Sequence, residues 1–247
     1  MLRRLDEGAY GKVEELFRDF APHRGHWGSA LRGAAPGEVL ADSAEEPRAA
    51  LVRPDDGFAY IACRGDPAAF AADCRGLFAR ESAEAAARGE GSCLELVTDD
   101  PALESRVAEF FGDLPWFAVP RLLFRAPAAP PAPSAPPPGA LPRRLREGRG
   151  IGVVLEMEGR EAGCARTMTY GGEAEVDIEV EEPFRGRGLG RLLGAELLRF
   201  CADEGLAARW TCWEDKEESR RLAERLGFIL ERRFMVYIHD SAEGAGS

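Results

Sequence analysis

The stretch FRGRGLGRLL, residues 184–193, decides the fold that this chain is predicted to adopt. It follows a strand candidate, Ala174–Val180, in which charged and apolar residues alternate, and it opens an apolar helical stripe that runs to about Asp203. Glycines let the backbone turn tightly and approach a ligand closely. The unpaired N–H groups of a helix N-terminus favour an anion. The stretch therefore predicts a turn that binds a phosphate or pyrophosphate.

A Gly/Arg-rich connection that binds nothing is the alternative, and the position between a strand and a helix weighs against it. The stretch is not a Walker loop, because no Gly-Lys-Ser/Thr follows. It also differs from the dinucleotide fingerprint, since it follows the third strand of an antiparallel meander instead of opening a βαβ unit. Arg185, Arg187 and Arg191 place positive charge here in a chain of net charge −11.

The two halves of the chain share one predicted order of elements, with an α/β content. In the second half we expect these strands and helices: Ile151–Met157, Ala162–Thr169, Ala174–Val180, a helix to Asp203, Ala207–Trp213, a helix over 215–226 and Phe228–Ile238. In the first half we expect helices over 9–20 and Trp27–Leu31, strands Glu38–Ala41, Ala49–Arg53 and Phe58–Cys63, a helix over 67–87, strand Cys93–Val97, a helix over 101–111 and strand Trp116–Phe124. A short repeat, RVAEFFG (106–112) and RLAERLG (221–227), favours two related domains.

A proline-rich segment separates the halves. Half of the residues from Pro127 to Pro142 are proline, which donates to neither helix nor sheet. A proline-rich ligand for a partner domain is the sharper alternative to a spacer. We predict a first domain over 1–125, a linker over 126–142, a second domain over 143–240 and a frayed tail over 241–247.

Composition limits the classes of partner. A pI near 5.0 argues against nucleic-acid binding, and no segment is apolar over a membrane-spanning length, so we expect neither nucleic acid nor membrane as a partner. Acidic residues arrive early in the N-terminal MLRRLDE, which favours a cytoplasmic protein. The six scattered cysteines indicate buried thiols, and no spacing predicts a metal site. A homodimer is compatible with the sequence but does not follow from it.

The motifs resemble the GNAT superfamily of acetyl-CoA-dependent N-acetyltransferases. Arg185, Gly188 and Gly190 meet its Arg/Gln-x-x-Gly-x-Gly/Ala signature, and PF (183–184) and LGF (226–228) are also similar. More narrowly, WTCWED (210–215), Ser219, LAERLGF (222–228) and FMVYI (234–238) resemble the zwittermicin-resistance type of GNAT protein. Segments between 37 and 60 are similar to that group's N-terminal domain.

The resemblance implies a mixed central sheet with flanking helices, preceded by a degenerate GNAT-like domain, and acetyl-CoA (CoA) as cofactor. The strand ending at Val180 would splay from its neighbour starting near Ala207, with the pantetheine arm between them. An amine would attack the thioester directly in a ternary complex. The cofactor-binding residues that it implies are Val180, Arg185, Gly186, Arg187, Gly188, Leu189, Gly190, Arg191 and Ser219.

Candidates for the proton acceptor lie on the acidic face of strand 174–180. Glu175 is preferred, because some GNAT enzymes have a glutamate base at about this position, and Asp177 and Glu179 share its face. Solvated carboxylates on an open sheet are the alternative. Ala223 stands where many members have a general-acid tyrosine. Tyr237 or Cys212 is the substitute candidate, against a core role for each.

Two features depart from the family pattern. The second half lacks the strand and two helices that usually precede the first hairpin, so either the first domain covers that side or the pocket is open. The first domain has CRGDP (63–67) where a pyrophosphate loop would stand, which predicts a non-catalytic partner. His23, His26, Trp27 and Trp116 are candidates to line an acceptor pocket, against core or surface roles.

Together these features predict an N-acetyltransferase that moves acetyl to the amine of a small cationic molecule. Two alternatives stay open at this point. One is a GNAT-like binding or scaffold protein without turnover, and the other is an acetyltransferase acting on a protein or peptide amine.

Overall fold

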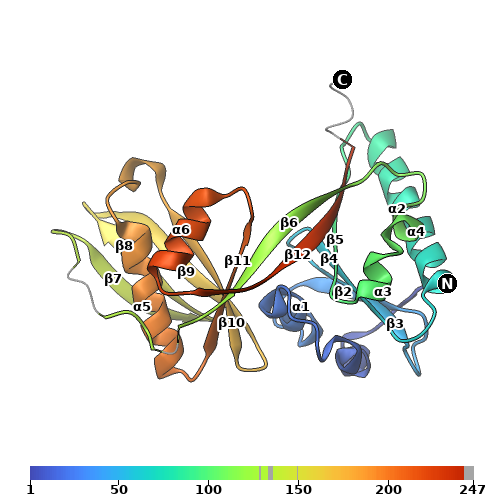
Figure 1. The fold of residues 1–247 in the computed structure, drawn as a ribbon, viewed down its shortest axis with the longest axis horizontal. Helices are drawn as coiled ribbons and strands as arrows, with labels where there is room; N and C mark the ends of the chain where they lie inside the picture. Colours follow the sequence, from blue (N-terminus) through green and yellow to red (C-terminus); the bar gives the residue numbers. More distant parts are fainter. Residues whose placement is uncertain (128, 133–135, 149, 242–247) are drawn as a thin grey trace. The chain divides into compact units, whose positions relative to one another are not determined.

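The computed structural model describes residues 1–127, 129–132, 136–148 and 150–241, and the chain divides into two compact units (Figure 1). Unit 1 comprises Met1–Pro22, Ala30–Pro120 and the described part of Phe234–Ser247. Unit 2 comprises His23–Ser29 and Arg121–Arg233. The predicted tail over 241–247 lies outside the described residues except for Ser241, as do 128 and 133–135 of the predicted linker.

Unit 2 is a mixed sheet covered by helix α5, with strand order β6-β11-β10-β9-β8-β7. Neighbouring strands run antiparallel except β10 and β11, which are parallel. The apolar stripe of α5 packs on the sheet, and Leu193 and Leu197 are fully buried in this core. The elements are β7 (Leu141–Glu147), β8 (Gly150–Met157), β9 (Arg160–Tyr170), β10 (Glu173–Val180), the 3-10 turn η3 (Glu182–Phe184), α5 (Leu189–Asp203), β11 (Ala207–Trp213) and α6 (Glu217–Arg225).

Unit 1 repeats this arrangement with strand order β1-β2-β3-β4-β5-β12. Strands β4 and β5 are parallel and the other described pairs antiparallel. Helices α2 and α4 supply Phe70, Phe78, Phe110 and Phe111 to its core. Its elements are β1 (Arg3–Arg4), η1 (Glu7–Lys12), η2 (Glu14–Phe17), β2 (Gly37–Ala41), β3 (Ala49–Pro54), β4 (Phe58–Cys63), α2 (Ala68–Ala87), β5 (Cys93–Thr98), α3 (Pro101–Glu104) and α4 (Val107–Phe111).

Each unit takes one strand from the other half of the sequence. Strand β6 (Phe117–Arg125) pairs with β11 in unit 2, where Leu122 faces Cys212. Strand β12 (Ile229–Asp240) pairs with β5 in unit 1, where Tyr237 faces Leu96. Because these strands are exchanged, the units do not coincide with the predicted domains over 1–125 and 143–240.

The mixed α/β class and most predicted elements are confirmed, with five differences. The helix expected over 101–111 is divided into α3 and α4, and the short strand β1 was not predicted. The region 9–20 forms two 3-10 turns instead of one helix. Residues 141–147, which were expected to precede the first strand, form β7. The helix expected at Trp27–Leu31 begins earlier, as α1 (Arg24–Leu31). Among the described residues, no helix has the length and apolar character needed to cross a bilayer.

Candidate active site

The parallel strands β10 and β11 pair only at their first residues. The paired residues are Glu173 with Ala207, Ala174 with Ala208, and Glu175 with Arg209. Beyond Glu175, β10 continues to Val180 without a ladder to β11, as the GNAT resemblance implies for this strand pair. The backbone of 178–180 therefore has no strand partner on this side, although Val180 O already accepts a hydrogen bond from Arg185 Nε.

A cavity of about 660 Å³ begins where the two strands part. It is lined by the end of β10, the turn before α5, Trp210 of β11 and the exposed face of α6. Trp210 Nε1 donates to Ser219 Oγ at 3.2 Å, which joins β11 to α6 along one wall. The volume lies within the range of small-molecule and cofactor sites.

The N-terminus of α5 opens on this cavity. Gly186 and Gly188 have φ of +75° and +78°, a backbone conformation that residues other than glycine rarely adopt. The N–H of Leu192 donates to Gly188 O at 3.2 Å and closes the first helical bond, so the amides of Leu189, Gly190 and Arg191 precede the ladder. A Cβ on Gly188 would meet no heavy atom within 4 Å. The turn therefore has the open, donor-rich geometry that an anion site requires.

Arginine side chains surround the same opening. Arg185, Arg191, Arg221 and Arg225 line the cavity together with Glu179 and Glu218. Arg221 pairs with Glu217 at 2.5 Å, and Arg185 Nε donates to Val180 O at 3.0 Å. Within the described part of the chain, the side chains of Arg191 and Arg225 form no ion pair. Two guanidinium groups are therefore available to a polyanion.

The predicted cofactor residues come together here with one exception. Val180, Arg185, Gly186, Gly188, Leu189, Gly190, Arg191 and Ser219 all line the cavity. Arg187 points elsewhere, since its Nη1 lies 3.3 Å from Glu158 Oε1 and its guanidinium lies 5.3 Å from the centre of the Phe184 ring. An elongated ligand with a phosphate group at one end fits these cavity residues. The residues present are therefore compatible with CoA.

Glu175 stands apart from the other carboxylates of its strand. Its side chain is 4% exposed, whereas Asp177 and Glu179 are exposed. Thr211 donates a hydrogen bond of 2.9 Å to Glu175 Oε1, and Oε2 is buried with no hydrogen-bond partner. Burial raises the pKa of Glu175, and His26, Thr211 and Arg121 oppose this shift by favouring the charged form. A carboxylate with a raised pKa suits a general base.

The backbone of α1 covers Glu175. A Cβ on Gly25 would stand 2.7 Å from Glu175 Cβ and 2.4 Å from Met168 O, and one on Gly28 would overlap the Tyr170 ring. The Trp27 ring packs against Tyr170 at 5.1 Å between centroids. Residues 23–29 therefore provide unit 2 with a helix over the sheet face on which Glu175 lies, whereas α5 packs on the face of Ala174 and Val176.

The other pocket candidates do not come together in one place: His23 is buried, His26 acts on Glu175, and Trp116 is exposed in unit 1. His23 is buried, and burial, followed by Arg121, lowers its pKa well below the usual value. His26 favours the ionised form of Glu175. Trp116 belongs to unit 1, where it stacks on Phe111 at 5.6 Å between ring centres. The predicted acceptor-side residues thus divide between the units.

Tyr237 lies in the hydrophobic core of unit 1 and not in unit 2, which holds Glu175. Its ring packs edge-on against Trp116, and burial raises its pKa to about 12. It is therefore placed as a core residue. Cys212 is buried in the core of unit 2, and burial raises its pKa.

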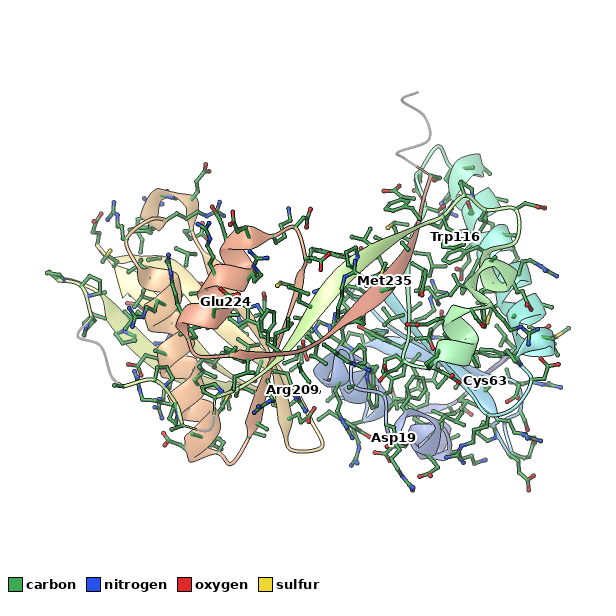
Figure 2. All side chains as sticks on the ribbon, viewed as in Figure 1. Asp19, Cys63, Trp116, Arg209, Glu224 and Met235 are labelled. Atoms are coloured by element: carbon green, nitrogen blue, oxygen red, sulfur yellow. The ribbon has the colours of Figure 1, made fainter. Side chains whose placement is uncertain are left out.

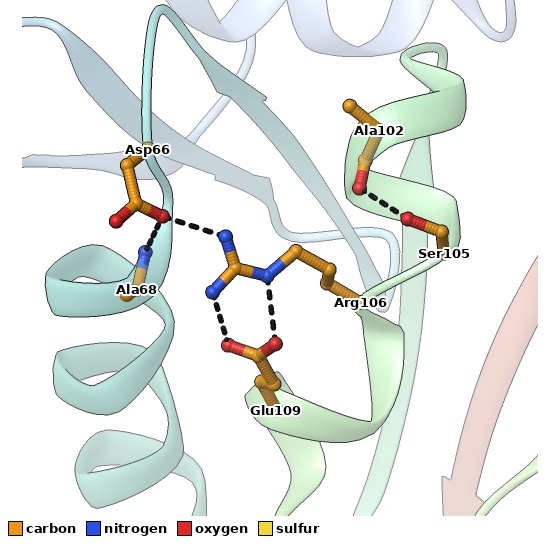
Figure 3. A network of polar contacts seen from close by, with 6 residues as sticks. All are labelled: Asp66, Ala68, Ala102, Ser105, Arg106 and Glu109. Atoms are coloured by element: carbon orange, nitrogen blue, oxygen red, sulfur yellow. Dashed lines mark hydrogen bonds and ion pairs between the residues drawn. The ribbon is translucent and has the colours of Figure 1, made fainter.

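Unit 1 fills the corresponding helix N-terminus with its own carboxylate (Figure 3). Asp66 Oδ1 accepts from the Ala68 N–H at 3.1 Å and from Arg106 Nη1 at 2.6 Å. Arg106 also forms two hydrogen bonds with Glu109, at 2.7 and 2.8 Å. Because a negative charge already occupies the position, a phosphate is not accommodated there.

Sequence reasoning missed two residues of the site, Thr211 and Arg121. Arg121 Nη2 lies 3.3 Å from Thr211 Oγ1, and its guanidinium stacks 4.4 Å from the Trp213 ring centre. The alternation of β11 places Thr211 on the face opposite Cys212, but nothing local shows that β6 lies beside it. Arg209, labelled in Figure 2, pairs with Glu173 at 2.8 Å instead of Glu175.

The second half of the chain is similar to a known family of proteins. The family model described as GNAT acetyltransferase matches residues 146–237. The Bacillus subtilis (strain 168) protein named "Uncharacterized N-acetyltransferase YdfB" is 30% identical over 74 residues, which are 30% of this chain. The match spans only 28% of that relative's length. Residues 146–237 are thus similar to GNAT acetyltransferases, and the predicted GNAT resemblance is confirmed at the level of that family.

Solved structures share the fold over nearly the whole chain. A GCN5-related N-acetyltransferase-like protein from Streptococcus suis 89/1591 matches with a TM-score of 0.66 and 20% identity, covering 93% of this chain and 98% of that one. A tandem GNAT protein from the clavulanic acid biosynthesis pathway matches with a TM-score of 0.59 and 16% identity, covering 97% and 98%. At these identities the likeness concerns the fold.

Proposed function

We propose that this protein is an acetyl-CoA-dependent N-acetyltransferase whose acceptor is the amine of a small cationic molecule. One observation carries the proposal: strand β10 has a buried carboxylate, Glu175, at one point and borders, at Val180, an open cavity that arginines and the N-terminus of α5 line. A base and a cofactor cavity on one strand are what direct acyl transfer requires.

The chain's own residues would hold the cofactor at both ends of the cavity. The amides of Leu189, Gly190 and Arg191 and the side chains of Arg191 and Arg225 would bind its phosphates. Backbone groups of 178–180, which have no strand partner toward β11, would hold the pantetheine arm, with Arg185 releasing Val180 O. When bound, acetyl-CoA would supply a thioester: the amine nitrogen would attack its acetyl carbon, the C–S bond would break, and the second proton lost by the nitrogen would go to the thiolate that leaves as CoA.

Glu175 would take the proton that the attacking nitrogen must lose. A substrate ammonium would transfer one proton to the carboxylate and become a neutral amine with a free lone pair. The raised pKa of Glu175 makes this transfer less unfavourable than it would be to an ordinary glutamate. Exposed Asp177 and Glu179 would attract a cation to this side of the sheet.

The choice of a small cationic acceptor rests on the resemblance to the zwittermicin-resistance type and on these carboxylates. A division of labour between a catalytic unit 2 and a non-catalytic unit 1 is supported by the Asp66 carboxylate at the α2 N-terminus. A cytoplasmic location, and the absence of nucleic-acid and membrane partners, stay predictions of the sequence.

The test is thiol release from acetyl-CoA with a panel of small cationic amines, aminoacyl compounds and peptides. We expect Glu175→Gln to lower kcat/KM by about 10²–10⁴-fold, and Asp177→Asn and Glu179→Gln to lower it by less. Acetyl-CoA binding without turnover on any amine would favour the binding or scaffold alternative. Turnover with peptides but with no small amine would favour the alternative in which the acceptor is a protein or peptide amine.

A further inference from the structure

We infer that Thr211 is a positioning residue that holds Glu175 so that Oε2, and not Oε1, receives the substrate proton, with Arg121 fixing the direction of the Thr211 hydroxyl. This inference rests on the proposed function and deepens it to the level of single atoms. Sequence motifs do not point to it, since the three residues lie on β10, β11 and β6.

The Thr211 hydroxyl has two neighbours and a single hydrogen to donate. Arg121 Nη2 donates to Thr211 Oγ1 at 3.3 Å, and a guanidinium cannot accept a hydrogen bond. The Thr211 hydroxyl has one hydrogen, and Glu175 Oε1 lies 2.9 Å from its oxygen. With a donor already facing Thr211 Oγ1, the hydroxyl hydrogen points to Glu175. Oε1 is thereby held as an acceptor.

The two oxygens of Glu175 are therefore not equivalent. Oε2 is buried and has no hydrogen-bond partner, although a buried carboxylate oxygen without one is costly. An ammonium hydrogen, or a water that relays one, would satisfy it. The transferred proton forms an O–H bond at Oε2 while the Thr211 bond to Oε1 stays in place.

The support behind Thr211 is rigid. Arg121 lies opposite Trp213 in the β6–β11 pairing, and its guanidinium stacks 4.4 Å from the centre of that ring. A stacked, charged donor holds one orientation better than a flexible chain does. The hydroxyl of Thr211 therefore meets the same partner before and after proton transfer.

Other charged groups also face Glu175, and they determine the size of the effect. His26 of α1 and Arg121 of β6 favour the charged form, Glu173 on the same strand disfavours it, and the β9 residue opposite, Met168, is uncharged. Removing the Thr211 hydroxyl leaves all of these in place. Its loss alone should raise the pKa of Glu175, because one hydrogen bond to the carboxylate disappears.

The experiment compares Thr211→Val, which keeps the shape, with Thr211→Ser, which keeps the hydroxyl. The first readout needs no substrate: the Glu175 carboxyl is titrated by 13C NMR, with Glu175→Gln to assign the signal. We expect the midpoint to rise by about one pH unit in Thr211→Val and to stay within a few tenths of the wild-type value in Thr211→Ser. Circular dichroism checks that each variant is folded.

The second readout is the pH profile of kcat/KM at saturating acetyl-CoA. The acid limb should move up with the NMR midpoint in Thr211→Val and return in Thr211→Ser, with the KM for acetyl-CoA unchanged. An unmoved midpoint in Thr211→Val, or an equal shift in Thr211→Ser, overturns the inference. If Glu175→Gln is inactive while Thr211→Val titrates as wild type, the proposed function survives and the positioning role does not. If the NMR midpoint moves and Glu175→Gln retains full activity, the proposed base fails instead.

Discussion

Gly25 lies directly against Glu175, although the two residues are far apart in the sequence. A side chain at position 25 would place its Cβ 2.7 Å from Glu175 Cβ, closer than carbon atoms approach without displacement. The helix that buries the proposed base thus comes from the N-terminal half of the chain, and a glycine is what allows its approach.

Substitution of Gly25 tests this contact. Gly25→Ala should lower the free energy of unfolding by about 1–3 kcal/mol, because the new methyl group overlaps Met168 O and Glu175 Cβ. Gly76→Ala is the matched control, since Gly76 is also helical but exposed, and a Cβ added there would meet no heavy atom within 4 Å. That variant should gain about 0.5–1 kcal/mol. Equal effects of both in chemical denaturation would show that α1 does not pack here.

The pKa of Glu175 predicts how stability depends on pH. Because its folded-state pKa is raised, the folded protein binds the Glu175 proton more tightly than the unfolded chain does. This contribution is fully present below the unfolded pKa, about 4.3, and is lost as pH rises through the folded pKa. Glu175→Gln cannot ionise, so its unfolding free energy should exceed that of the wild type increasingly over this window. Parallel curves for the two proteins would contradict the buried carboxylate.

The cavity arginines predict a salt-dependent affinity for CoA. Arg191→Ala and Arg225→Ala should each weaken binding about three- to tenfold at low ionic strength, and less at high salt, because screening already reduces the attraction. Arg88→Ala is the control, since Arg88 is an exposed arginine of unit 1 paired with Glu90. Calorimetry at two salt concentrations measures the effect, and a loss independent of salt would contradict an electrostatic role.

Local patterns predict the part of the molecule that is built locally. The alternation of 174–180 and the apolar stripe after Gly190 correspond to β10 and α5 to within a residue or two. The expectation that no strand precedes the first hairpin of the second half was wrong, because residues 141–147 form the edge strand β7. This segment contains a proline and several arginines, which an edge strand tolerates.

Long-range features could not be read in this way. Glu175, Asp177 and Glu179 look alike in the alternating strand, and only the packing of α1 buries one of them. The exchange of β6 and β12 places Tyr237 in the core of unit 1, because strand pairing depends on partners distant in the sequence. The glycines at 25 and 28 indicate that another backbone can approach this helix closely. The sequence does not show which strand lies against them.

Calorimetric titration with acetyl-CoA tests the central claim most directly. Gly188→Glu places a carboxylate at the open N-terminus of α5, and Gly172→Glu is the matched control in the β9–β10 turn, with φ of +81° against +78° and equally open space. We predict that the wild type and Gly172→Glu bind acetyl-CoA alike and that Gly188→Glu binds at least about tenfold more weakly, because two negative groups repel at close range. Absent binding by the wild type, or equal affinity of the two glutamate variants, would contradict the assignment of the cavity.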